Sequence, residues 1–172
     1  MRFPRNILSL GVDLVFPRDC PGCGRLIDAE GGPWCDSCAR DLLMRITPGY
    51  CPRCGTYVGP YMADAADCPR CVNQALPLDG AVCVGEYSGV LADVICKYKY
   101  GRQQRMDGIL GAMLSDAIRG RPWGGRVDGL VPVPASWLER WGYGFYPVAL
   151  LANVVGGELG LPVLSVVGIR GK

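Results

Sequence analysis

Four closely spaced pairs of cysteines constrain this chain more than any other feature of its sequence. Each pair has the spacing C-x-x-C, and all four lie between residues 20 and 71 of a 172-residue chain. Structural zinc sites place four ligands in a tetrahedron, and thiolates suit that geometry. Two pairs complete one site, so the spacing predicts two structural Cys₄ zinc sites. The eight predicted ligands are Cys20, Cys23, Cys35, Cys38, Cys51, Cys54, Cys68 and Cys71.

The cysteine-rich segment is also an internal repeat. The sequence CPGCG at 20–24 recurs as CPRCG at 51–55, and a second C-x-x-C pair follows each copy. Joining consecutive pairs closes the shortest loops, which favours one site within 20–38 and another within 51–71. An interleaved pairing stays open, and so does iron, because Cys₄ knuckles also hold iron. Disulfides are disfavoured, since the sequence shows no export signal.

Composition excludes several classes of function. The chain has no histidine, which rules out Ser-His-Asp catalysis, a histidine base and histidine metal ligands. The formal net charge of +2 gives no strong attraction to nucleic acid or membrane. Two zinc ions bound by eight thiolates would lower this charge to about −2. No apolar run is long enough to span a membrane, and the reduced cysteines predict a cytoplasmic protein.

The chain divides into three predicted parts. An apolar segment occupies residues 1–17, the double cysteine unit residues 18–76, and a segment of mixed helical and strand patterning residues 80–172. The double unit holds few large apolar side chains, so its folding energy must come largely from metal binding.

Apolar periodicity in the third part predicts both helices and strands. Helices are expected from Ser88 to about residue 100, around 109–118 and over 147–159. Strands are expected over 81–87 and 127–133, and a buried strand over 163–167. The order β-α-α-β-α-β is typical of a parallel sheet with helical crossovers. We therefore expect an α/β fold, and Cys83 and Cys96 are interpreted as buried, inert thiols.

A basic stretch covers the end of the first of these helices and the residues after it. Its four cations lie within nine residues and are interleaved with tyrosines, which is a pattern that meets phosphates or a nucleic-acid backbone. The alternative is a solvated helix end, where cations are favoured by the helix dipole. A fifth cation lies near the PVP turn that ends the 127–133 strand, where ligands bind in parallel α/β folds. The candidate phosphate- or DNA-binding residues are Lys97, Lys99, Arg102, Arg105 and Arg140.

Together these motifs resemble the ComF family of bacterial competence-associated proteins. The resemblance rests on the cysteine knuckles, the YSGV segment at 87–90, Lys99-Tyr100-Gly101, the PVP turn, and a Gly-Phe pair before a Leu-Leu-Ala helix. It implies a double zinc ribbon followed by a type I phosphoribosyltransferase-like domain. It also implies handling of single-stranded DNA or nucleotides, with DNA or competence-machinery proteins as partners.

Two departures from the family pattern bear on catalysis. The family's R-G-F-N-Q motif is replaced by YGFYP at 143–147, and no Asp-Asp pair exists in the sequence. That pair belongs to the loop that binds phosphoribosyl pyrophosphate and Mg²⁺, so both cofactors are expected only in a complete domain. We therefore expect an incomplete parallel-sheet domain without transferase activity, and self-association through an exposed sheet edge. The alternative function is a non-catalytic zinc-ribbon module that binds protein or nucleic acid.

Overall fold

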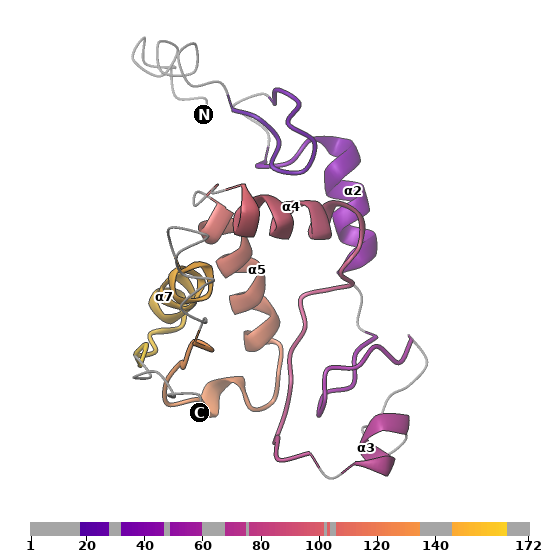
Figure 1. Ribbon diagram of the computed structural model, residues 1–172, viewed down its shortest axis with the longest axis vertical. Helices are drawn as coiled ribbons and strands as arrows, with labels where there is room; N and C mark the ends of the chain where they lie inside the picture. The colour runs from indigo at the N-terminus through magenta and orange to yellow at the C-terminus, as the bar shows by residue number, and fades with distance from the viewer. Residues whose placement is uncertain are drawn as a thin grey trace, which may run out of the picture.

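The computed structural model describes residues 18–27, 32–46, 49–59, 68–74, 76–101, 103, 106–134 and 146–164. The helices in these ranges, in chain order, are α2 (Asp36–Arg45), α3 (Pro69–Asn73), α4 (Gly89–Tyr100), α5 (Asp107–Arg119) and α7 (Pro147–Leu159), with a 3-10 turn η3 (Gly124–Arg126). Figure 1 shows α4 lying across one end of α5, α7 beside α5, and α2 next to the start of α4. No helix in the described ranges is long and apolar enough to cross a membrane.

Helices α4, α5 and α7, called here the helical body, share one apolar core with α2. The buried members of this core are Leu42, Leu91, Val94, Tyr98, Met106 and Leu110. The three members from α4 recur at intervals of three and four residues, so they lie on one face of the helix. The buried Tyr98 hydroxyl donates a hydrogen bond of 2.8 Å to the Pro147 carbonyl, which joins α4 to the start of α7.

Local signals fix the ends of α7 and its distance from α5. The helix spans the predicted residues 147–159, with proline at its first position. It stops at Gly160, whose φ of 69° is left-handed and costs glycine no steric strain. At the crossing with α5, a side chain on Gly111 would collide with Val154, so glycine permits the close approach of the two helices.

The predicted parallel sheet is wrong. The described residues contain three isolated bridges and no sheet, and only the bridge between Leu130 and Val163 is parallel. The 163–167 segment was expected to be buried, yet Leu164 is 53% exposed, and residues 165–167 lie outside the described ranges. The zinc-ribbon half of the predicted fold class is supported, whereas the phosphoribosyltransferase-like sheet is not.

The backbone of residues 81–87 explains part of this failure. Two of its amides donate to the ribbons and not to a neighbouring strand: Ala81 N–H donates to the Pro52 carbonyl, and Glu86 N–H donates to the Arg45 carbonyl at the end of α2. A backbone donor that is satisfied in this way is not available to a sheet ladder. Figure 1 shows it as an extended connection between the second cysteine unit and the helical body. The predicted self-association required an exposed sheet edge, and the described ranges contain no sheet that could provide one.

Candidate metal centres

The eight predicted ligands form two groups, each built from consecutive C-x-x-C pairs. The groups are Cys20, Cys23, Cys35 and Cys38, and Cys51, Cys54, Cys68 and Cys71. Within each group, all four sulfur atoms lie within 4.8 Å of one another. The structure thus selects the sequential pairing over the interleaved one. We call residues 18–27 with 32–46 the first ribbon, and residues 49–59 with 68–74 the second ribbon.

Each ribbon begins with the same tight turn. The Cys20 carbonyl accepts a hydrogen bond from the Gly24 amide, and the Cys51 carbonyl accepts one from the Gly55 amide. Both glycines are left-handed, with φ of 74° and 73°. One antiparallel bridge then closes each loop, Asp19 with Leu26 in one ribbon and Tyr50 with Tyr57 in the other. The repeated sequence therefore folds twice into the same local structure.

The sulfur spacing fits tetrahedral zinc. The Sγ atoms of Cys23 and Cys35 are 3.6 Å apart, and those of Cys54 and Cys68 are 3.7 Å apart. A tetrahedron with Zn–S bonds of about 2.3 Å has edges of about 3.8 Å. A disulfide needs about 2.05 Å, so these pairs are not disulfide-bonded. Four thiolates fill a tetrahedral site, which leaves no open position for substrate and makes both sites structural.

The thiols in each group differ in how readily they ionise. Hydrogen bonding with Ser37 lowers the pKa of Cys35 to about 6, and hydrogen bonding with Thr56 lowers the pKa of Cys54 to about 6. Burial raises the pKa of the last cysteine of each group, Cys38 and Cys71, to about 12. Because zinc binds thiolates, loading either site must release protons, and its affinity must rise with pH.

Charged side chains connect the first ribbon to the start of α4. The Asp41 carboxylate on α2 accepts a 2.9 Å hydrogen bond from the Val90 amide in the first turn of α4. This bond, together with Arg45, holds the pKa of Asp41 below its usual value. Arg45 itself donates to the Ser88 hydroxyl and forms an ion pair with Glu86 at 3.6 Å. Nothing in the sequence indicated these contacts, because they join residues more than 40 positions apart.

The predicted phosphate-binding residues divide into three cases. Lys97 donates hydrogen bonds to the carbonyls of Pro21, at 3.0 Å, and Gly22, so its ammonium group faces the first ribbon. Lys99 is exposed, and its ammonium group makes no hydrogen bond or ion pair with the part of the chain that the structure describes. The remaining three, Arg102, Arg105 and Arg140, lie outside the described residues.

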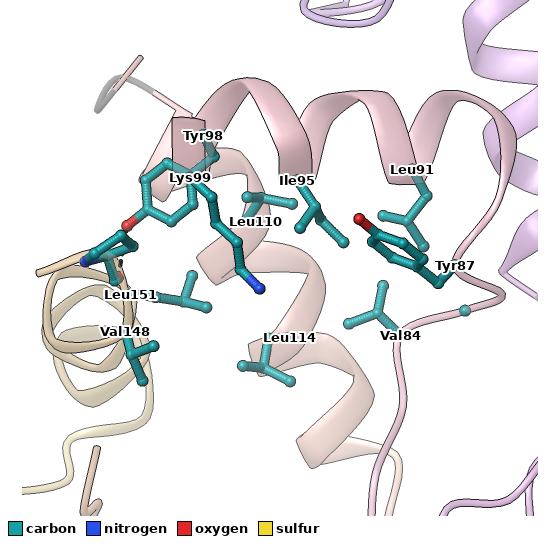
Figure 2. Close-up of a pocket in the computed structure, with 12 residues that line it drawn as sticks. Val84, Tyr87, Leu91, Ile95, Tyr98, Lys99, Leu110, Leu114, Val148 and Leu151 are labelled. Carbon is teal, nitrogen blue, oxygen red and sulfur yellow. Dashed lines mark hydrogen bonds between the residues drawn. The ribbon is translucent and has the colours of Figure 1, made fainter. Parts of the chain in front are cut away.

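Lys99 borders a cavity of about 320 Å³ between α4, α5 and α7. The lining is mainly apolar, and Figure 2 shows the Lys99 ammonium group directed toward the space between Leu114 and Leu151. The ring of Tyr87 lies at the other end of this space, below Leu91. The sequence did not identify this cavity, because its lining comes from three helices and the 81–87 segment, which only the folded chain brings together. A hollow of this kind can accept a flat apolar ring that is linked to an anion.

The two remaining cysteines are half-buried, not buried as predicted. Cys83 lies beside the second ribbon, where its thiol is 3.4 Å from the Gly55 carbonyl. Cys96 lies on α4, with its sulfur 3.2 Å from the Tyr87 hydroxyl. Neither belongs to a metal-binding group among the described residues.

Comparison with known proteins agrees with this geometry. Residues 11–72 match a family described as a double zinc ribbon domain, and this range contains all eight ligands. The two sites are therefore zinc sites, one Zn²⁺ ion for each Cys₄ group. No solved structure matches the chain significantly.

Three curated proteins resemble the chain over most of its length. Competence protein F of Haemophilus influenzae is 27% identical over 150 residues, which cover 85% of this chain and 62% of that protein. The DNA utilization proteins YhgH of Salmonella typhimurium and Salmonella typhi are each 27% identical, over 86% of this chain and 64% of their own length. The chain thus spans less than two thirds of the length of the curated relatives that it matches.

Proposed function

Because the chain belongs to the ComF family of double-zinc-ribbon proteins, we propose that it binds single-stranded DNA during DNA uptake or utilisation. The names of its relatives support a role with DNA, and the absence of an open zinc position argues for binding and not zinc catalysis. The proposal places the protein in the cytoplasm, where thiolates stay reduced. The proposal concerns DNA binding alone.

The observation that carries this proposal is the cavity bordered by Tyr87 and Lys99. Proteins bind single-stranded DNA by stacking bases on aromatic rings and by pairing the phosphates with cations. Tyr87 is 64% exposed, and Tyr100, which follows Lys99 in the sequence, is 65% exposed. A base seated against Tyr87 in the apolar hollow would bring a phosphate within reach of Lys99. Arg102 and Arg105 follow Lys99 in sequence and would extend the phosphate contacts.

Lys97 takes no part in this proposal. An ammonium group has three donors, and two of those on Lys97 are used by backbone carbonyls of the first ribbon. The phosphate-binding set therefore becomes Lys99, Arg102 and Arg105, and Arg140 stays a separate prediction.

A titration with a fluorescent oligothymidylate tests the proposal. Changing Lys99, Arg102 and Arg105 to Gln should weaken binding and flatten its salt dependence. The slope of log K against log salt should fall by about 2, because each lost contact with single-stranded DNA contributes about 0.7. The control variant changes the exposed Arg25, Arg53 and Arg126 to Gln, which removes the same amount of charge elsewhere on the protein. Its slope of log K against log salt should stay close to that of wild type. Equal slopes in both triple variants would reject the assigned surface.

The tyrosine gives a second, salt-independent test. Tyr87→Leu removes the stacking ring, so it should weaken binding about tenfold while leaving the salt slope unchanged. Tyr57→Leu changes another exposed tyrosine, in the second ribbon, and serves as the control.

A protein-docking role is the second candidate, and α2 favours it. Leu43 and Met44 on its outer face are 71% and 73% exposed, which is unusual for neighbouring apolar residues on a helix. A competence-machinery protein is the partner class that the relatives' names suggest. No binding of single-stranded DNA by the zinc-loaded chain at low salt would favour this alternative.

A further inference from the structure

Lys97 connects α4 to the metal-binding loop of the first ribbon across about 75 positions of sequence. Its ammonium group donates to the carbonyls of Pro21 and Gly22, which are the two residues between the ligands Cys20 and Cys23. A flexible lysine side chain loses conformational freedom when it is held in this way, so the contact must return free energy to persist. Both acceptors belong to the loop whose shape sets the positions of the two sulfur atoms.

Gly22 makes this approach possible. It is buried, and a Cβ atom at this position would lie 2.8 Å from the Cys38 sulfur and 2.9 Å from a Val90 methyl carbon on α4. The loop is therefore packed between its own fourth ligand and the helix that carries Lys97. Any larger residue at position 22 would push α4 away from the ribbon.

The second ribbon has no equivalent device among the described residues. The residue that corresponds to Gly22 is Arg53, which is exposed. The Pro52 carbonyl corresponds to that of Pro21, and it accepts a hydrogen bond from the neutral backbone amide of Ala81. A loop held by one neutral hydrogen bond is less strongly fixed than one held by an ammonium group on two carbonyls.

Charge gives the contact a second role. Four thiolates around one Zn²⁺ leave an excess of negative charge at the site, and a cation held next to the ligand loop offsets part of it. Groups that orient metal ligands from outside the coordination sphere commonly change metal affinity by 10–100-fold. The geometry therefore makes the two sites unequal, although their ligand sets are the same.

We propose that Lys97 is a positioning residue of the first zinc site: it holds the Cys20–Cys23 loop in its metal-binding shape, so that the first zinc ion leaves the protein more slowly than the second. The consequence is a stable zinc site joined to the helical body and a second site that exchanges its metal first. This inference rests on zinc binding alone and holds whether or not the chain binds DNA.

Zinc release from the full chain tests the proposal. With two Zn²⁺ bound and a chromophoric chelator in excess, the wild-type protein should release its zinc in two phases. Lys97→Met should speed the slow phase by about 10–100-fold and leave the fast phase unchanged. Lys97→Arg, which keeps the charge and the donors, should restore most of the slow phase. Lys99→Met is the matched control on the same helix and should change neither phase.

Two further measurements assign the phases. A full-chain variant carrying Cys54→Ser and Cys71→Ser should bind one zinc ion and show only the slow, Lys97-sensitive phase. With cadmium in both sites, Lys97→Met should move the ¹¹³Cd resonance of the first site and leave that of the second in place. Unchanged release in Lys97→Met, or equal acceleration of both phases, would overturn the proposal, because equal acceleration means only a general loss of stability.

The unmodified chain provides a test that does not depend on the folding of a variant. After half of the zinc has been released, the exposed thiols are alkylated and located by mass spectrometry. Among the eight zinc ligands, alkylation should fall mainly on Cys51, Cys54, Cys68 and Cys71. Alkylation mainly in the first ribbon, or equally in both, contradicts the proposed order of release.

Discussion

The two zinc ribbons share the C-x-x-C spacing of their ligand pairs but differ in how the helix after the third ligand packs. In the first ribbon the helix after the third ligand is α2, ten residues long, and its Leu42 lies in the core of the helical body. In the second ribbon the corresponding helix is α3, five residues long, with no buried residue. Figure 1 shows the first ribbon against α4 and the second set apart from the helical body. The repeated sequence therefore fixes the metal site, and residues outside the ligands decide how each site joins the rest of the protein.

The α2 helix explains how one ribbon is integrated. Cys38 and Leu42 are four positions apart, so they lie on one face of α2, and both are buried. The same face therefore supplies a zinc ligand and a core residue. Trp34, just before the third ligand, also packs against the core. Losing the first zinc ion should consequently disturb the helical body, whereas losing the second should not.

The largest expected effect comes from removing one ligand in each ribbon. Cys38→Ser should lower the stability of the helical body by about 2–5 kcal/mol, the usual cost of losing a large apolar side chain from a core, because α2 would no longer hold Leu42 in place. Cys71→Ser, the matching change in the second ribbon, should alter it by less than about 0.5 kcal/mol. Thermal unfolding followed by far-UV circular dichroism, together with zinc content, measures both. Equal losses in the two variants would remove the distinction between the ribbons.

The next largest effect on stability is expected from exchanging Gly22 and Arg53, which occupy the same position in the first C-x-x-C pair of each ribbon. Gly22→Arg places a side chain against Cys38 and Val90, and overpacking of this kind costs about 1–3 kcal/mol. Arg53→Gly, the reverse exchange in the second ribbon, removes an exposed side chain and should be nearly neutral. Chemical denaturation of the zinc-loaded variants measures the difference. A neutral Gly22→Arg would show that the first ribbon does not depend on close contact with α4.

How far the sequence predicts the molecule depends on how far apart the interacting residues are. The ligands of each site lie within about 20 positions and repeat a known spacing, so their identity and pairing follow from local pattern. The helix α7 was predicted with its bounds because proline starts it and glycine stops it. In both cases the deciding residues are near neighbours in the chain.

Predictions that depended on residues far apart in the sequence were less accurate. The segments predicted as strands have strand-like sequences, but a sheet also needs neighbouring strands. In 81–87, the amides of Ala81 and Glu86 donate to the ribbons instead. Lys97 was assigned to phosphate from its place in a run of charges, and its observed partners are the carbonyls of Pro21 and Gly22, about 75 positions earlier. Charge runs carry no information about contacts of that kind.

A smaller effect is expected at Asp41, which joins the first ribbon to α4 and has no counterpart in the described part of the second. Its pKa is lowered in the folded protein by the hydrogen bond from Val90 and by Arg45. The stability that it contributes is therefore fully present above the ordinary aspartate pKa and is lost as the pH falls through the lowered value. Asp41→Asn should be less stable than wild type by a constant amount from pH 5 to 8. Denaturation midpoints across that range measure this, and a difference that shrinks between pH 8 and 5 would contradict it.

The smallest expected effect concerns the feature that the ribbons share. Ser37 and Thr56 lie two positions after Cys35 and Cys54, and each hydroxyl is 3.3 Å from the sulfur of that cysteine. With zinc bound, the sulfur is a thiolate and the hydroxyl must be the donor. One such hydrogen bond contributes about 1 kcal/mol, or about fivefold in zinc affinity. Ser37→Ala and Thr56→Ala should therefore weaken the first and second sites by the same small factor.

Competition with a chelator of known affinity measures both zinc affinities, and Ser37→Thr and Thr56→Ser, which keep the hydroxyl, are the matched controls. Effects that differ by more than about tenfold would mean that the inequality of the ribbons begins at the ligands themselves and not at Lys97 and Gly22 behind them.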